Sequence, residues 1–252
     1  MKLPAFLQGS SELTVSGPKI IASFDVFGIT IHFTETIVLQ WFVIAILLLT
    51  ARFLTHKLTI HGVSKRQAIA EMLVDAIHNL VADTMGKRWM FMAPYIATIF
   101  SFSIFGSLIS LLGLRSVTSD FSVLATWSAI TFVMITATKI RFTGVKGWLK
   151  GFLEPVPVML PINILSEVAT PVSMALRHFG NIAGGAVITA LLYYGLTGLS
   201  HLIGLQFPIF TIGIPAVLSL YFDLFSGFMQ AFIFCMLTMV FISNAAPDET
   251  DH

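Results

Sequence analysis

The sequence contains few charged residues and only one cysteine. Charged residues make up 11% of the 252 residues, whereas soluble domains carry about 25%. A soluble fold of this length could not cover its surface with so few charges, so lipid is the expected solvent for much of the chain. The single cysteine, Cys235, excludes an internal disulfide. The net charge of +1 excludes a broad basic face for nucleic acid.

The sequence also lacks the common motifs of catalysis. It contains no nucleotide-binding glycine loop, no HExxH, no CxxC and no nucleophilic triad. Its clustered glycines, Gly180, Gly184 and Gly185, lie in an apolar segment, which does not suit a phosphate loop. We therefore expect no catalysis by this chain alone, no cofactor and no metal site.

Long apolar runs predict an all-α integral membrane protein with about five crossings. One crossing takes about 20 mostly apolar residues. The first three candidates are Thr36–Leu54, Met90–Leu114 and Phe121–Thr138, the last rich in threonine, serine and alanine. Two further runs, Pro157–Leu199 and Gln206–Ala246, are each about twice the length of one perpendicular crossing. No charged turn interrupts them, so we expect long, strongly tilted helices rather than hairpins.

The segment Ser64–Gly86 has a different pattern from the crossings. Its apolar residues recur at steps of three or four, and its acidic residues lie off that stripe. The stripe consists of Ile69, Leu73, Ala76, Ile77 and Leu80, and the acidic residues are Glu71, Asp75 and Asp83. This pattern predicts an amphipathic helix that lies on the membrane surface.

Basic residues set the expected orientation. They flank the first two crossings on the side of the surface helix, and they follow the third crossing. The residues are Arg52, Lys57, Lys65, Arg66, Lys87, Arg88, Lys139, Arg141, Lys146 and Lys150. Basic loops face the cytoplasm, so we expect the N-terminus outside and the C-terminus inside.

These observations predict one membrane domain over residues 1–252. Its expected parts are an external N-terminal segment (1–33), a first crossing (34–57), the surface helix (64–86), a helical pair (90–138) and a long tilted helix pair (155–247).

Between Pro155 and Pro247 the chain has only three formally charged residues, Glu167, Arg177 and Asp223. A charge at mid-membrane costs about 2.5–3.5 kcal/mol on insertion scales. Three such residues are therefore candidates for function.

Arg177 shares a helical stripe with small and polar residues. The stripe is Ser173, Gly180, Asn181 and Gly184. An arginine keeps its charge in proteins, so Arg177 suits a gate or a counter-charge better than a proton carrier. The alternatives are that Arg177 extends to the membrane surface, or that the glycines only form a packing seam.

Asp223 shares its stripe with Ser219, Ser226, Gly227 and Gln230. It suits a proton relay, and the alternative is a static ion pair with Arg177. Glu167 lies near the start of the fourth run, where it is either a half-channel carboxylate or an interfacial acid. His178 and His201 are interpreted as structural.

Three segments resemble the a subunit of F-type ATP synthases. Lys146–Glu167 (KGWLKGFLEPVPVMLPINILSE) and Pro171–Asn181 (PVSMALRHFGN) resemble the central signature of that family, and Met229–Phe234 (MQAFIF) matches the signature near its C-terminus. The resemblance extends from the first crossing to the C-terminus.

The resemblance implies that Arg177 is the essential arginine facing a ring of c subunits, with Asn181 and Gln230 as polar companions. It implies two long tilted helices against that ring, a peripheral stalk of b subunits, and a bacterial plasma membrane. The expected ring-facing surface comprises Ser173, Gly180, Gly184, Ser226 and Gly227.

One position departs from the family pattern. Many members carry a carboxylate or histidine nine residues after the arginine, where this chain has Ala186. The second ionisable site of the family, seven residues before the glutamine, corresponds to Asp223. The entry role is therefore expected to fall to Asp223. Glu167, ten residues before the arginine, matches a position where some bacterial members carry an acid.

These residues suggest two offset half-channels that deliver protons to a rotor ring. The alternative is a proton-coupled secondary transporter, which usually shows internal repeats and broken mid-membrane helices. Neither feature is found in the sequence. A purely structural scaffold would leave Arg177 and Asp223 unexplained.

Overall fold

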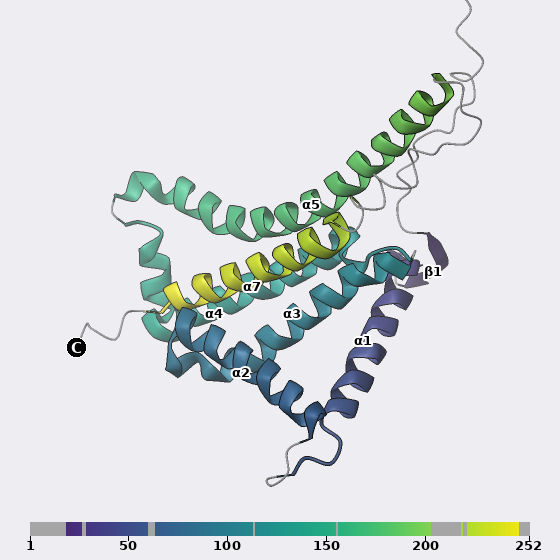
Figure 1. Ribbon diagram of the computed structural model, residues 1–252. Coiled ribbons are helices and arrows are strands. Elements are labelled where there is room, and N and C mark those ends of the chain that lie inside the picture. Colours follow the sequence, from purple (N-terminus) through teal and green to yellow (C-terminus); the bar gives the residue numbers. More distant parts are fainter. Residues whose placement is uncertain are drawn as a thin grey trace, which may run out of the picture.

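The computed structural model describes residues 19–26, 29–59, 64–112, 114–154, 156–202, 218 and 221–246. Helices dominate this part of the chain (Figure 1). The strands and main helices are β1 (Ile20–Val26), β2 (Ile29–Thr34), α1 (Glu35–Leu54), α2 (Lys65–Met85), α3 (Ala93–Leu108), α4 (Phe121–Gly151), α5 (Leu160–Leu202) and α7 (Gly227–Asn244). Short 3₁₀ segments are η2 (Lys87–Met92), η3 (Ile109–Leu112), η4 (Val117–Ser119) and η5 (Pro157–Met159), and η6 (Tyr221–Ser226) is π-helical.

Five helical segments of the described chain are long and apolar enough to cross a membrane. They are Glu35–Leu54, Lys87–Leu112, Phe121–Gly151, Pro157–Ser200 and Leu224–Asn244. The predicted all-α membrane class is confirmed.

The fourth apolar run forms one continuous helix, as predicted. α5 has 43 residues, which makes it about 65 Å long at the usual rise per residue. The hydrocarbon core is about 30 Å thick. α5 therefore fits within it only if its axis is strongly tilted away from the membrane normal. Figure 1 shows α5 running above α7 in this view and extending beyond the other helices at its C-terminal end. Much of the first half of the other predicted long run, Gln206–Ala246, lies outside the described residues.

The helical core lies between α2, α3 and α7. Fully buried Ile96 of α3 packs in one cluster with Cys235 and Met239 of α7 and with Val81 of α2. The lone cysteine thus packs as a small apolar residue. The backbones of α3 and α7 approach closely, because a Cβ atom on Gly227 would lie 2.9 Å from Cβ of Ser107.

α4 extends well beyond the predicted end at Thr138. The helical assignment continues to Gly151 across a kink at Gly144, whose φ of 73° is left-handed. Glycine adopts this conformation at little cost. Hydropathy identified the apolar part of this helix and missed its basic continuation. A helix can continue from lipid into water, so the end of an apolar run does not mark the end of the helix.

α2 agrees with the predicted surface segment. The Ser64 side chain accepts a hydrogen bond from the Gln67 backbone N–H at 3.3 Å, which caps the helix start. The residues of the predicted apolar stripe differ in burial. Ile77 packs against the core cluster, whereas Ile69 and Leu73 are exposed. The location of this helix on the membrane surface stays a prediction.

The β1–β2 hairpin was not predicted. Its two strands pair antiparallel from Ile20 opposite Thr34 to Val26 opposite Ile29. The sequence signal was two runs with β-branched and aromatic residues, separated by only two residues, one of them glycine. A search for crossings of membrane length passes over such short runs.

Candidate ion-translocation site

α5 has an inner face and an outer face around Arg177. Met174, Ala175 and His178 are buried against the other helices. Ser173, Arg177, Gly180 and Asn181 are exposed, and Gly184 is half-buried. The predicted stripe is thus on the outer face of the helix.

The Arg177 guanidinium has no hydrogen bond or ion pair with any other described residue. Exposed apolar side chains lie beside the small and polar stripe: Leu176 is 51% exposed and Val172 is 48% exposed. A charged group among lipid-facing side chains is costly. The outer face of α5 therefore carries a charge that no described side chain neutralises, beside exposed apolar residues.

The two predicted polar companions meet across α5 and α7. The Asn181 side-chain amide donates to the side-chain oxygen of Gln230 at 2.6 Å. Gln230 is only 1% exposed, so this contact satisfies part of a buried amide that lies far from Asn181 in sequence. It also fixes the angular position of the Arg177 turn relative to α7.

His178 lies on the inner face, within an aromatic cluster. Its ring centroid is 6.3 Å from that of Trp127 and 6.0 Å from that of Phe234. The residue is fully buried, and neither ring nitrogen has a hydrogen-bond partner among the described residues. These contacts support the interpretation of His178 as a packing residue. His201 has no described side chain.

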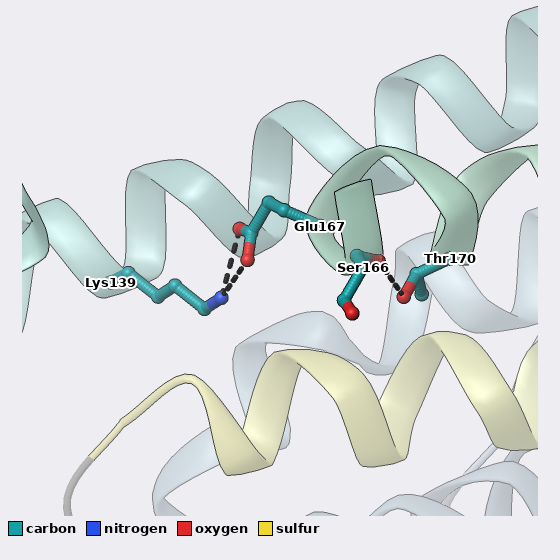
Figure 2. Close-up of polar contacts among 4 residues, drawn as sticks. All are labelled: Lys139, Ser166, Glu167 and Thr170. Carbon is teal, nitrogen blue, oxygen red and sulfur yellow. Dashed lines mark hydrogen bonds and ion pairs between the residues drawn. The ribbon is translucent and has the colours of Figure 1, made fainter. Parts of the chain in front are cut away.

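Glu167 forms an ion pair that the sequence did not indicate. The Lys139 ammonium on α4 lies 2.8 Å and 2.6 Å from the two carboxylate oxygens of Glu167 on α5. Figure 2 shows the two side chains extended toward each other across the space between their helices. The residues are separated by 28 positions in sequence, so no motif spacing links them.

The same region contains two adjacent cavities. One, of about 410 Å³, lies between α4 and the start of α5. The other, of about 200 Å³, includes residues from the end of α7. Lys139, Glu167 and Thr170 line both cavities. The side chain of Asn163 donates to the carbonyl oxygens of Phe152 and Glu154, which holds the start of α5 to the segment after α4.

A larger cavity, of about 700 Å³, lies at the other end of α4. Its wall comes from β2, α1, α3 and the start of α4. The polar lining consists of His32, Thr34, Thr36, Gln40, Thr98, Asp120, Ser122 and Thr126. Trp127 lines this cavity and also contacts His178. The only sequence signal was the hydroxyl-rich third crossing, since the lining residues come from separate elements.

The predicted relay residue Asp223 lies in η6, which packs against α5 and α3. Its side chain, like that of Ala186, lies outside the described residues. Ser226 is half-buried at the end of η6. Gly227, predicted on the ring-facing surface, is buried against Ser107 of α3. The close approach of α3 occupies that side of the glycine.

The fold and the site define a class of protein. It is a multi-pass helical membrane protein in which charged and polar groups gather along one long helix and its neighbours. The profile of the family described as ATP synthase A chain matches residues 37–243, and the chain belongs to this family. It is therefore a non-catalytic membrane-sector subunit of an ATP synthase complex.

Individual relatives agree with this assignment. The "ATP synthase subunit a, sodium ion specific" of Propionigenium modestum is 32% identical over 231 residues, covering 85% of this chain and 75% of that protein. Subunit a of Desulforamulus reducens is 32% identical over 220 residues, with coverages of 86% and 81%. Subunit a of Moorella thermoacetica is 30% identical over 211 residues, with coverages of 83% and 89%.

Proposed function

We propose that this chain is the proton-translocating stator subunit of a rotary ATP synthase. Arg177 faces a ring of c subunits, and two half-channels lead to that ring from opposite sides of the membrane. The chain lies in a bacterial plasma membrane with its N-terminus outside and its C-terminus in the cytoplasm, and it is held by a peripheral stalk of b subunits. The ion path consists of Arg177, Asp223, Glu167, Asn181 and Gln230.

The exposed position of Arg177 on α5 carries this proposal. Only 6% of the most apolar stretch of α5 is buried within the chain, although the helix bears a permanent charge. Lipid would leave that charge without a partner. A neighbouring helix with an ionised carboxylate would neutralise it. A rotor ring meets this requirement, because each of its subunits would present such a group in turn.

The locations of the cavities support two offset half-channels. The larger cavity includes Asp120–Trp127 at the start of α4. The smaller cavities include Lys139 and the end of the same helix. Trp127 and Lys139 are separated by about 18 Å along α4 at the usual helical rise. With the proposed orientation, the larger cavity opens to the outside and the smaller ones to the cytoplasm.

The proposed cycle starts with a proton that enters from outside and passes Asp223. It neutralises a ring carboxylate, which can then face lipid. After nearly a full turn, the site releases its proton near Glu167 and meets Arg177 again. Arg177 attracts the ionised carboxylate and keeps the half-channels separate. One charge crossing 100 mV releases about 2.3 kcal/mol, so several protons must be coupled to each ATP.

The purified complex tests the nature of the transported ion. In sealed vesicles, the rates of ATP-driven internal acidification with about 50 mM Na⁺ and without added Na⁺ should agree to within about twofold, because the ring carboxylate binds H⁺ and not Na⁺ in this proposal. A sodium-specific relative makes this test necessary. Acidification that stops when Na⁺ is present, together with ²²Na⁺ uptake, would contradict proton coupling.

Gly184→Leu tests the outer face of α5. A Cβ atom at Gly184 meets nothing within 4 Å in the described chain, so leucine there is expected to leave the subunit folded and to weaken its contact with the ring. We expect less c subunit to co-purify and ATP-driven pumping to fall about tenfold, as for loss of a well-packed contact of one or two kcal/mol.

Gly227→Leu is the matched control for this substitution. Its Cβ atom would lie 2.9 Å from Cβ of Ser107 within the same chain, so the expected defect is lower abundance of the subunit itself. A disulfide from Ser173→Cys to a cysteine on a c-subunit helix would report the contact directly. If Gly184→Leu assembles and pumps like the wild type, the face does not meet the ring.

A further inference from the structure

The pair Lys139–Glu167 forms a wall shared by two cavities. Both side chains line the cleft of about 410 Å³ and the pocket of about 200 Å³. The ammonium contacts both carboxylate oxygens, at 2.8 Å and 2.6 Å. The pair, drawn in Figure 2, therefore lies where the linings of the two cavities meet.

The pair contains the only charged side chains among the described residues that line either cavity. From α5 the cavities also receive Asn163, Ser166 and Thr170, and from α4 Thr143. The end of α7 contributes Phe241, Asn244 and Ala245. No further described charge from α4, α5 or α7 lines the cavities to compensate Lys139 or Glu167. Removal of one partner would therefore change the net charge of the passage.

The pair is neither fully exposed nor sealed. The Lys139 side chain is 33% exposed and that of Glu167 is 17% exposed. A strut inside a dry core would be more deeply buried, and an ordinary surface pair would be more exposed. Partial exposure beside two cavities fits a pair in contact with water.

We propose that Glu167 neutralises Lys139 at the inner half-channel, so that the passage carries no net charge, and that Glu167 is not itself the carrier of the proton. This inference rests on the proposed function and names Lys139 as a further positioning residue of the same ion path. An unpaired ammonium in the shared lining of the two cavities would repel a proton that moves there. The carboxylate removes that barrier by holding the ammonium across the cleft.

Three variants of the complete complex test this assignment. Glu167→Gln leaves Lys139 unpaired, and ATP-driven proton pumping is expected to fall about tenfold. Lys139→Met leaves a carboxylate, which does not repel protons, so the rate should stay within about threefold of wild type. The double variant Lys139→Met/Glu167→Gln is neutral again and should recover to within about threefold of wild type.

The pair Lys150–Glu154 provides a matched control. Its atoms are 3.7 Å apart, and the side chains are 76% and 65% exposed. Glu154→Gln also leaves a lysine unpaired, but in open solvent, so pumping should be unchanged. Assembly is measured in every variant by the amount of complex recovered.

Recovery in the double variant distinguishes the possible roles of Glu167. If Glu167 carries the proton, the double variant stays as slow as Glu167→Gln. If the pair is only a strut, both single variants lower the amount of complex recovered, and pumping per recovered complex stays close to wild type. Either result overturns the inference.

Water access to the passage provides a readout independent of turnover. Thr170 lines both cavities. A cysteine introduced there by Thr170→Cys should react with a membrane-impermeant maleimide applied from the cytoplasmic side. Background labelling should be low, because the native Cys235 is fully buried. Failure of Thr170→Cys to react in assembled complex would show a dry passage and overturn the inference. A wild-type complex that pumps no protons would instead overturn the proposed function.

Discussion

Arg177→Ala is expected to abolish coupled proton transport. Loss of a charge interaction of about 3 kcal/mol at mid-membrane corresponds to a fall of about a hundredfold. Without the guanidinium, the two half-channels are also expected to join, so membranes stripped of the catalytic sector should conduct protons passively. ATP-driven acidification of vesicles and the decay of an imposed pH gradient measure these two effects.

Arg177→Lys tests whether Arg177 acts through its positive charge alone or also through the shape of its guanidinium group. Lysine retains the positive charge but lacks the planar, delocalised guanidinium, and its charge state is more easily changed by burial. We expect this variant to fail nearly as completely as Arg177→Ala. Arg52→Ala is the control, because Arg52 is an exposed arginine in the last turn of α1. Normal pumping by either Arg177 variant would contradict the role given to this residue.

The membrane helices were predictable because the hydrocarbon core imposes a length. The predicted run Pro157–Leu199 and the observed α5, Leu160–Leu202, differ by three residues at each end. The spacing of Ser173, Arg177 and Gly180 also predicted a shared face, and the structure exposes all three. Helical periodicity is sufficient for such a prediction, since it needs no knowledge of neighbouring helices.

Contacts between helices were not predictable in the same way. The Lys139–Glu167 pair depends on how α5 returns along α4, and sequence spacing does not contain that information. The family pattern identified Asn181 and Gln230 as companions, but only the packing of α5 on α7 shows that one donates to the other. Gly227 belongs to a stripe of small and polar residues, which suggested an outer face. The close approach of Ser107 instead buries this glycine within the chain.

Asp223→Asn is expected to cause the other large loss of function. Asparagine preserves the volume and much of the hydrogen bonding of aspartate. Unlike a carboxyl group, its amide cannot bind and release a proton in a transport cycle. Because Ala186 carries no titratable group, Asp223 is the one acid that the sequence offers to the outer half-channel near mid-membrane. We expect proton flux to fall about a hundredfold, at the lower end of the usual contribution of a positioned proton-transfer group. Complex recovery should be unchanged, and Asp223→Glu should retain part of the flux.

A second substitution makes this prediction more demanding. η6, which contains Asp223, packs against α5, which contains Ala186. If the two positions face each other across the half-channel, Ala186→Glu should partly restore pumping to Asp223→Asn. Val187→Glu adds the same group one residue further round α5, on an exposed side, and should not restore it. A fully active Asp223→Asn single variant would mean that water alone carries the proton inward. Asp223 would then serve as a static partner of Arg177, and the outer half-channel would need no acid near mid-membrane.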